Sequence, residues 1–125
     1  MPQTQDAAAY LPASRDLTSL REAVERGRGC DLYQNATQAV FGAGATGTLV
    51  LVGEQPGDQE DRQGEPFVGN AGGVLERALI AAGLTRGDVY VTNAVKHFKW
   101  TPRVKRRIHD TPRASEIRAC RPWLE

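Results

Sequence analysis

Late in the sequence, three consecutive cations are followed two positions later by a histidine, in the run Lys105-Arg106-Arg107-Ile108-His109. Cations of this kind bind phosphates and can hold a nucleic-acid strand, which would bring a sugar close to the imidazole. A neutral imidazole is a nucleophile, and cleavage of a glycosidic bond leaves an electron-deficient anomeric carbon that a nucleophile can attack. The simpler interpretation, which the spacing alone favours, is one more DNA-contacting histidine in a basic loop.

A second group of polar residues follows the apolar stretch 48–52, which is typical of a parallel strand buried on both faces. Glu54, Gln55 and Asp58 come directly after this stretch. Ligands bind at the carboxyl ends of the strands in open α/β sheets, so these side chains lie where a site is expected. Either carboxylate could stabilise the electron-deficient carbon or polarise an imidazole.

Two further residues are expected at the same edge of the sheet. Asn93 ends a second strand, residues 88–93, and its amide offers the donor and the acceptor that a planar base edge requires. Phe67, in a nearby loop, could stack on such a base. Taken singly, Asn93 is better explained as a turn residue and Phe67 as a core anchor. Their convergence on one edge favours a pocket for a small planar ligand.

The elements that must position these residues form a strand–helix–strand unit. A helix is predicted over residues 71–82, where apolar residues recur at helical spacing and Gly83 follows as the terminating residue. The strands 48–52 and 88–93 flank it, so their sheet should be parallel and the crossover right-handed. The predicted fold class is therefore α/β, a parallel sheet flanked by helices.

The remaining stretches give weaker signals. Residues 1–16 are expected to be a flexible arm and residues 17–125 the folded domain, whose first short helix is capped by Asp16. Thr111-Pro112 is expected to begin the last helix. The stretches expected to be loops are residues 58–69 and 96–107.

The glycine pattern Gly42–Gly47 matches the GxGxxG motif of dinucleotide-binding proteins. That motif follows a strand and opens a helix, whereas here the pattern precedes the strand. We therefore expect a flexible loop, and a nucleotide-binding enzyme is the least favoured function.

The charge of the chain is uneven along its length. The formal net charge is +1, but residues 1–95 hold 7 Lys and Arg against 12 Asp and Glu, and residues 96–125 hold 9 against 3. A basic segment on an acidic body indicates an anionic partner such as a phosphate backbone, although a solvated helix face would have the same composition. The sequence has no long apolar run and no secretory leader, so we expect a cytoplasmic protein with no membrane contact.

Two cysteines, Cys30 and Cys120, lie far apart in the sequence. A structural disulfide is not expected in a cytoplasmic chain, which leaves two buried thiols or half of a metal site. The count alone favours two unrelated thiols.

Three motifs in order resemble the iron–sulfur uracil-DNA glycosylases, from about residue 17 to the end of the chain. Residues 53–58 with Pro66–Gly69 resemble the first motif of this family, and Tyr90–Lys96 resembles its second strand. The run Lys105–His109, followed by Thr111-Pro112, resembles an insertion of the X-type branch. Members of that branch excise uracil and then remain covalently bound to the DNA.

The resemblance implies a role for each candidate residue. His109 would attack the deoxyribose carbon once the base leaves, Glu54 would orient or activate His109, and Asp58 would lie near the reacting centre. The expected partner is uracil-containing, single-stranded DNA, bound by a monomer. The implied uracil contacts are Gln55, Phe67 and Asn93, and the expected DNA-binding cations are Lys105, Arg106 and Arg107.

The resemblance also implies a [4Fe-4S] cluster, with Cys30, His97 and Cys120 at ligand positions. The family pairs its first cysteines as CxxC, but Gly27 stands at the partner position here. The fourth ligand could be water, an exogenous thiol or nothing, so the occupancy of the cluster is open, and a cluster with three protein ligands is more labile.

A second departure concerns the C-terminal half of the family. Relatives supply two further strands and a His-Pro-Ser-type motif after the region matched here. We therefore expect an incomplete domain with apolar sheet surface exposed. Two other functions stay open at this point, an ordinary glycosylase that turns over and a non-catalytic nucleic-acid-binding fragment.

Overall fold

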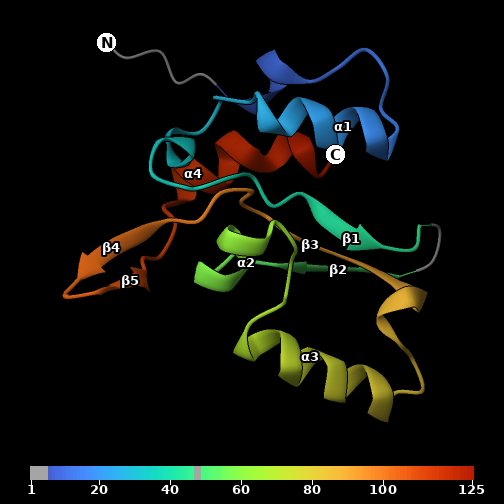
Figure 1. The fold of residues 1–125 in the computed structure, drawn as a ribbon. Helices are drawn as coiled ribbons and strands as arrows, with labels where there is room; N and C mark the ends of the chain where they lie inside the picture. Colours follow the sequence, from blue (N-terminus) through green and yellow to red (C-terminus); the bar gives the residue numbers. More distant parts are fainter. Residues whose placement is uncertain (1–5, 47–48) are drawn as a thin grey trace.

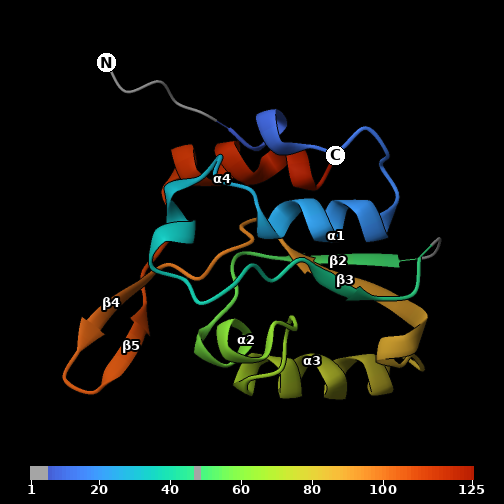
Figure 2. The same ribbon diagram turned by 45° about the horizontal axis from the view of Figure 1, so that its top comes forward.

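Helices lie on both faces of a small sheet in the computed structural model, which describes residues 6–46 and 49–125 (Figure 1). The strands are β1 (Gly42–Gly44), β2 (Leu49–Gly53), β3 (Val89–Asn93), β4 (Trp100–Arg103) and β5 (Arg106–His109). The α-helices are α1 (Leu17–Glu25), α2 (Asp58–Gln63), α3 (Asn70–Ala81) and α4 (Ala114–Cys120), and the 3-10 helices are η1 (Ala7–Tyr10), η2 (Asp31–Gln34), η3 (Arg86–Asp88) and η4 (Arg121–Trp123). Figure 2 shows α1 and α4 on one side of the sheet and α2 and α3 on the other, which confirms the predicted α/β class.

The main sheet has the order β1-β3-β2 and is mixed. β2 and β3 are parallel, as predicted, with Gly53 opposite Asn93, and α3 connects them. β1 is antiparallel to β3, so the prediction of a purely parallel sheet is wrong. The glycines at the start of the pattern Gly42–Gly47 explain why β1 can pair with β3. A Cβ on Gly44 would collide with the Val89 carbonyl, so glycine lets the strands approach.

The first part of the glycine pattern is therefore a strand and not the predicted loop, because its glycines permit pairing with β3. The end of the pattern, residue 47, and the first residue predicted for the next strand, residue 48, lie outside the described residues.

β2 lies at the edge of the sheet, and this corrects the prediction that it is buried on both faces. Val50 and Val52 are 54% and 53% exposed, whereas every residue of β3 is buried. The difference follows from strand order, because β3 has a neighbour on each side and β2 has only one among the described strands. Apolar sheet surface is thus exposed, as expected.

The layer that contains α1 and α4 holds the larger apolar core. Ala7, Val24, Ala39, Phe41 and Trp123 form one buried cluster that joins the start of the described chain to its end. Residues 7–10, predicted to belong to a flexible arm, form η1 and pack against η4 instead, because Ala7 is needed to fill this core. Residues 1–5 of that arm lie outside the described part.

The helix boundaries show which local signals were informative. Asp16 caps α1 as predicted, since its Oδ1 accepts the Ser19 N–H at 2.8 Å. The last helix begins at Ala114, later than the Thr111-Pro112 signal, because Glu116 accepts the Arg113 N–H at 2.7 Å and completes the cap there. Within the described residues, no helix has the length and apolar character needed to cross a membrane.

Two segments predicted to be loops are ordered. In α2, Glu60 Oε1 accepts the N–H of Gly57 at 2.9 Å, and Gly64 ends the helix with a φ of 78°. Residues 100–109 form an antiparallel hairpin, β4–β5, which extends sideways from the body of the protein (Figure 1). Both segments lie next to the site described below.

Candidate active site

A pocket of about 270 Å³ lies between α2, the end of β3 and the base of the β4–β5 hairpin. Its wall contains five of the predicted site residues: Gln55, Asp58, Phe67, Asn93 and His109. The residues come from segments that are far apart in the sequence, so the fold brings together five of the six residues predicted for catalysis and uracil binding. Glu54 is not part of this wall.

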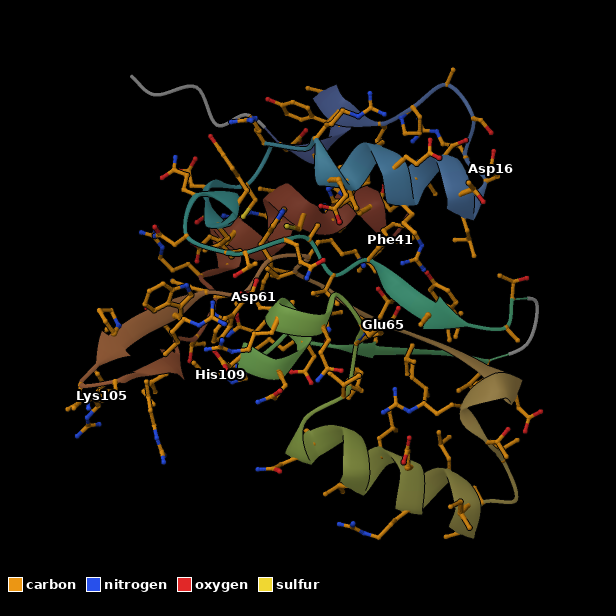
Figure 3. All side chains as sticks on the ribbon, in the orientation of Figure 1. Asp16, Phe41, Asp61, Glu65, Lys105 and His109 are labelled. Atoms are coloured by element: carbon orange, nitrogen blue, oxygen red, sulfur yellow. The ribbon has the colours of Figure 1, made fainter. Side chains whose placement is uncertain are left out.

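His109 is the last residue of β5 and lies at the base of the hairpin beside α2 (Figure 3). Its ring meets Phe98 edge-to-face, with 5.3 Å between the ring centroids. On the other side, a Cβ built on Gly57 would lie 2.9 Å from His109 Nε2. The imidazole therefore occupies the space that glycine leaves free, with Nε2 at the pocket wall.

We expect Gly57→Ala to displace the imidazole and to lower the rate of a reaction that uses it by about 10- to 100-fold, because small misplacements of a reacting group are costly. The φ of Gly57 is −103°, which alanine adopts without strain, but the added Cβ would also lie 2.7 Å from Glu60 Oε1, so the cap of α2 must shift slightly together with the imidazole. Single-turnover kinetics beside thermal unfolding of the same variant would check both points. An unchanged rate would show that the Gly57 contact does not position His109.

Asn93 and Phe67 share the space above Gly53. Asn93 is 3% exposed, and a Cβ on Gly53 would collide with its Oδ1 and lie 2.6 Å from Phe67 Cζ. The Asn93 carbonyl accepts a hydrogen bond from Lys96 Nζ at 2.8 Å. The amide and the aromatic ring thus lie beside each other at the carboxyl ends of β2 and β3.

Arg86 holds the loop that presents Phe67. Its guanidinium donates to the carbonyls of Pro66, at 3.1 Å, and of Phe67. Phe67 has a φ of 54°, a left-handed conformation that is unusual for a residue other than glycine. The sequence reasoning missed Arg86, because its partners lie about 20 residues earlier in the chain and no local motif marks them.

Lys96 was also missed as a site residue. It is 1% exposed, and its ammonium donates to the carbonyls of Phe41 and Asn93 and to the Thr92 hydroxyl. Burial lowers the pKa of Lys96 to about 8. The side chain ties the end of β3, and hence Asn93, to the segment that precedes β1.

Gln55 has both ends of its amide occupied by the hairpin. Its Nε2 donates to the Asp110 carbonyl at 2.8 Å, and its Oε1 accepts the Lys99 N–H at 2.9 Å. Gln55 therefore links the turn after β2 to the base of the β4–β5 hairpin.

Glu54 is exposed, and its side chain has no hydrogen bond or ion pair among residues 6–46 and 49–125. Its backbone carbonyl accepts the Val95 N–H at 3.0 Å, which fixes the turn but not the carboxylate. The implied contact between Glu54 and His109 is not formed in this structure.

Arg107 points toward the protein and not toward solvent. Its Nε donates to Asp58 Oδ1 and its Nη1 to Asp61 Oδ2, both at 2.6 Å. The guanidinium also lies over the rings of Phe98 and Trp100, at 5.2 and 5.6 Å from their centroids. Of the three cations expected to contact DNA, Lys105 and Arg106 are exposed, whereas Arg107 attaches the hairpin to α2.

The two carboxylates bound by Arg107 differ in their surroundings. A hydrogen bond from Arg62, together with the bond and charge of Arg107, holds the pKa of Asp58 below its ordinary value against the opposing effect of burial. Asp61 is completely buried and also accepts the N–H of Thr37 at 2.8 Å. The sequence reasoning did not single out Asp61, although it is one helical turn from Asp58.

Cys30 and Cys120 are buried in one apolar cluster, and their thiols are close enough to shift each other's pKa in opposite directions. His97 is 7% exposed, burial lowers its pKa to about 4, and its Nδ1 has no hydrogen-bond partner among the described residues. A neutral imidazole with an unused nitrogen is suited to a metal.

The position of the missing fourth ligand is closed. A Cβ on Gly27 would lie 2.9 Å from Trp123 Cζ2, so the indole fills the place of a side chain there. In the described part of the chain, no three His, Cys, Asp or Glu side chains are grouped so that they could hold a metal ion. Cys30 and Cys120 supply two adjacent thiols, and His97 supplies a buried imidazole on a nearby segment. Together they do not fit a cluster that needs four protein ligands.

A second, larger cavity of about 560 Å³ lies on the far side of Phe67, between α3 and the sheet. Its wall includes Gly72, Glu76, Arg86 and Val91, and it contains no histidine or cysteine. The smaller pocket is the better candidate for chemistry, because it alone of these two combines an imidazole with an amide and an aromatic ring.

A mixed α/β sheet with such a pocket at the carboxyl ends of adjacent parallel strands is typical of proteins that bind a small ligand at this edge of the sheet. Residues 41–125 match the family described as the uracil-DNA glycosylase superfamily. The chain belongs to this superfamily.

Individual relatives agree with the family. A type-4 uracil-DNA glycosylase of Pyrobaculum aerophilum is 41% identical over 110 residues, which cover 87% of this chain and 53% of the relative. One of Thermotoga maritima is 46% identical over 76 residues, 60% of this chain and 40% of the relative. One of Sulfurisphaera tokodaii is 39% identical over 111 residues, 87% of this chain and 47% of the relative. The chain thus spans about half the length of these curated relatives.

Proposed function

We propose that this chain carries the base pocket and the nucleophile of an X-type uracil-DNA glycosylase, which excises uracil from single-stranded DNA and stays attached through His109. The protein is expected to act as a cytoplasmic monomer. The observation that carries the proposal is the position of His109 Nε2, at the wall of a pocket that also holds Asn93 and Phe67. Relatives named as uracil-DNA glycosylases support the choice of base.

The pocket would receive the extruded base. Phe67 offers a ring face for stacking, and the Asn93 amide offers a donor and an acceptor to the polar edge of uracil. Because Asn93 is almost completely buried, its orientation is restricted, and a base that presents the wrong edge would leave the amide unsatisfied. The turn around Gln55 would close the pocket from the side of the hairpin.

The covalent step conserves atoms and charge. The bond between C1′ and uracil N1 breaks and its electron pair leaves on uracil, while the lone pair of His109 Nε2 forms a new bond to C1′. The imidazole must carry its proton on Nδ1 beforehand, and after attack that proton passes through solvent to the departing uracil. The Asp58 carboxylate, at the same pocket wall, would stabilise the positive charge that develops on the sugar.

The test uses a single-stranded oligonucleotide with one uracil, incubated with residues 1–125 and, in parallel, with the product of the same reading frame to its stop codon. The mixtures are boiled in detergent and separated on a denaturing gel. A uracil-dependent band of protein joined to DNA supports the proposal. If neither protein gives that band, the proposal is overturned.

An ordinary glycosylase that turns over is the second candidate, and the names of the relatives favour it. It would release free uracil and leave an abasic site without a protein–DNA band. A non-catalytic binder would release no uracil, and its affinity would not depend on uracil but would fall steeply with salt. Measuring released uracil in the same samples separates these outcomes.

For the iron–sulfur cluster we propose a labile, incompletely occupied centre, because the implied ligands Cys30, His97 and Cys120 are not grouped around one metal position in the described part of this structure. Gly27→Cys combined with Trp123→Leu should raise the iron and acid-labile sulfide bound per chain, because it supplies a fourth thiol and clears the indole from its path. The matched control is Gly27→Ser with the same Trp123 change. Iron that is already complete and resistant to chelators in the unchanged protein would contradict this expectation.

A further inference from the structure

The free end of the β4–β5 hairpin carries a fully exposed valine. The strands pair with Arg103 opposite Arg106, so Val104 and Lys105 form a two-residue turn. Val104 is 98% exposed, more than any other large hydrophobic residue described. Lys105 marks this end of the hairpin in Figure 3, far from the main sheet.

Folding gives no reason for a valine at this position. Its φ is 58°, a left-handed conformation that β-branched residues rarely adopt. Two-residue hairpin turns place glycine or asparagine where φ is positive. Because the side chain also buries nothing, Val104 is unfavourable for both the backbone and the surface of the isolated hairpin.

Charge surrounds this apolar side chain. Arg103, Lys105 and Arg106 are all exposed, and none has an ion pair within residues 6–46 and 49–125. The hairpin's fourth cation, Arg107, is already bound to Asp58 and Asp61. An apolar side chain framed by free cations is complementary to stacked bases between phosphates, and less so to a neutral protein surface or to lipid tails alone.

The distance from the end of the hairpin to the nucleophile suits the same partner. His109 is three residues from Arg106 along β5, and a strand rises about 3.4 Å per residue, so the turn lies roughly 10 Å from the imidazole. Bases in a helix stack about 3.4 Å apart along each strand. The turn would therefore reach the DNA about three base steps from the extruded nucleotide.

We propose that Val104 is a wedge that enters the base stack about three steps from the target nucleotide, while Arg103, Lys105 and Arg106 hold the neighbouring phosphates. The inference rests on the proposed function for the identity of the target, and its partner is DNA with stacked bases. Insertion kinks the DNA on that side of the target, and the bend lowers the free energy needed to extrude the target base. The wedge matters most in duplex DNA, where the stack is most regular.

The decisive variant is Val104→Gly, which removes the wedge and relieves the positive φ, so the fold should be at least as stable. Val104→Leu is the matched control, because it keeps a large apolar side chain. Each protein is mixed with duplex DNA that carries 2-aminopurine three steps from a uracil, and fluorescence is measured on binding. The original protein and Val104→Leu should increase the fluorescence by unstacking the probe, and Val104→Gly should not.

Excision kinetics provide a second measurement on the same duplex and on the single strand. Val104→Gly should lower the rate on the duplex by about 10-fold, because unstacking a base step is costly, and should lower the rate on the single strand much less. Equal fluorescence and equal duplex rates for the original protein and Val104→Gly would overturn the wedge. If no protein excises uracil, the proposed function fails, but the fluorescence comparison still decides whether Val104 enters the stack.

Discussion

Replacing His109 with serine is expected to abolish the denaturation-resistant protein–DNA band completely. Serine removes the imidazole of the one described β5 residue that lines the pocket, and a neutral hydroxyl is a poor nucleophile without a base beside it. Phe67 and Asn93 are untouched, so the base pocket should still accept uracil. The variant is therefore expected to retain binding and, if water can reach C1′, to release uracil without capture.

The attachment point can be mapped directly, because the chain contains two histidines. Trypsin should release His109 within the peptide Ile108–Arg113 and His97 within the peptide His97–Lys99. Mass spectrometry should find the deoxyribose remnant on the first peptide alone. A remnant on His97, or an undiminished band in the His109→Ser variant, would contradict the assignment.

Arg106→Ser is the matched control for this substitution. Arg106 lies on the same strand as His109 but is exposed and outside the pocket wall. Its loss should leave the covalent band in place and weaken DNA binding modestly, with a smaller dependence of affinity on salt.

Replacing Arg107 with methionine is expected to destabilise the protein by about 3 kcal/mol, the usual result of leaving a buried charge without its partner. Asp61 is completely buried and would keep only its backbone N–H donors. The hairpin would also lose its attachment to α2, so His109 would no longer be held against Gly57. We expect urea unfolding at a lower denaturant concentration and a large loss of covalent capture.

Lys105→Met separates this positioning role from a direct DNA contact, because it removes the same charge from the exposed end of the hairpin. It should change the salt dependence of DNA binding and leave the free energy of unfolding unchanged. A second change, Asp61→Asn in the Arg107→Met background, should recover part of the lost stability. If Arg107→Met unfolds like the original protein and only its salt dependence changes, Arg107 binds DNA and does not position the hairpin.

The central unit of the fold could be predicted from the sequence because its signals are local. The apolar run of β2, the helical spacing of α3 and the terminating Gly83, with a φ of 79°, each lie within a few residues of the structure they determine. The convergence of Asn93 and Phe67 on one edge also followed, since carboxyl ends of parallel strands meet at the same side of a sheet.

The elements that were missed depend on distant partners. β1 is a strand only because β3 lies beside it, about 50 residues later in the chain. The β4–β5 hairpin lacks a glycine or asparagine turn and is rich in charge, so its local pattern favours a loop. It is held to the body of the protein in part by Arg107, whose partners Asp58 and Asp61 lie 49 and 46 residues earlier.

The same limit applies to the candidate site. A run of three cations predicts three equivalent phosphate contacts, but Arg107 turns inward because two carboxylates and two aromatic rings surround it. The Glu54 contact implied by resemblance was not formed, whereas Gln55 acquired two backbone partners in the hairpin. Residue type and spacing indicated which residues gather at the pocket, but not which hydrogen-bond partners each side chain has.

The single carboxylate of Asp61 has a consequence that reaches beyond the pocket. It accepts the Thr37 N–H through Oδ1 and Arg107 through Oδ2, so the hairpin and the segment before β1 share one anchor. By thermodynamic reciprocity, a ligand that holds the hairpin in place also strengthens the Thr37 bond. Hydrogen exchange at this one backbone amide should slow when DNA binds, which makes Thr37 an internal reporter of hairpin docking.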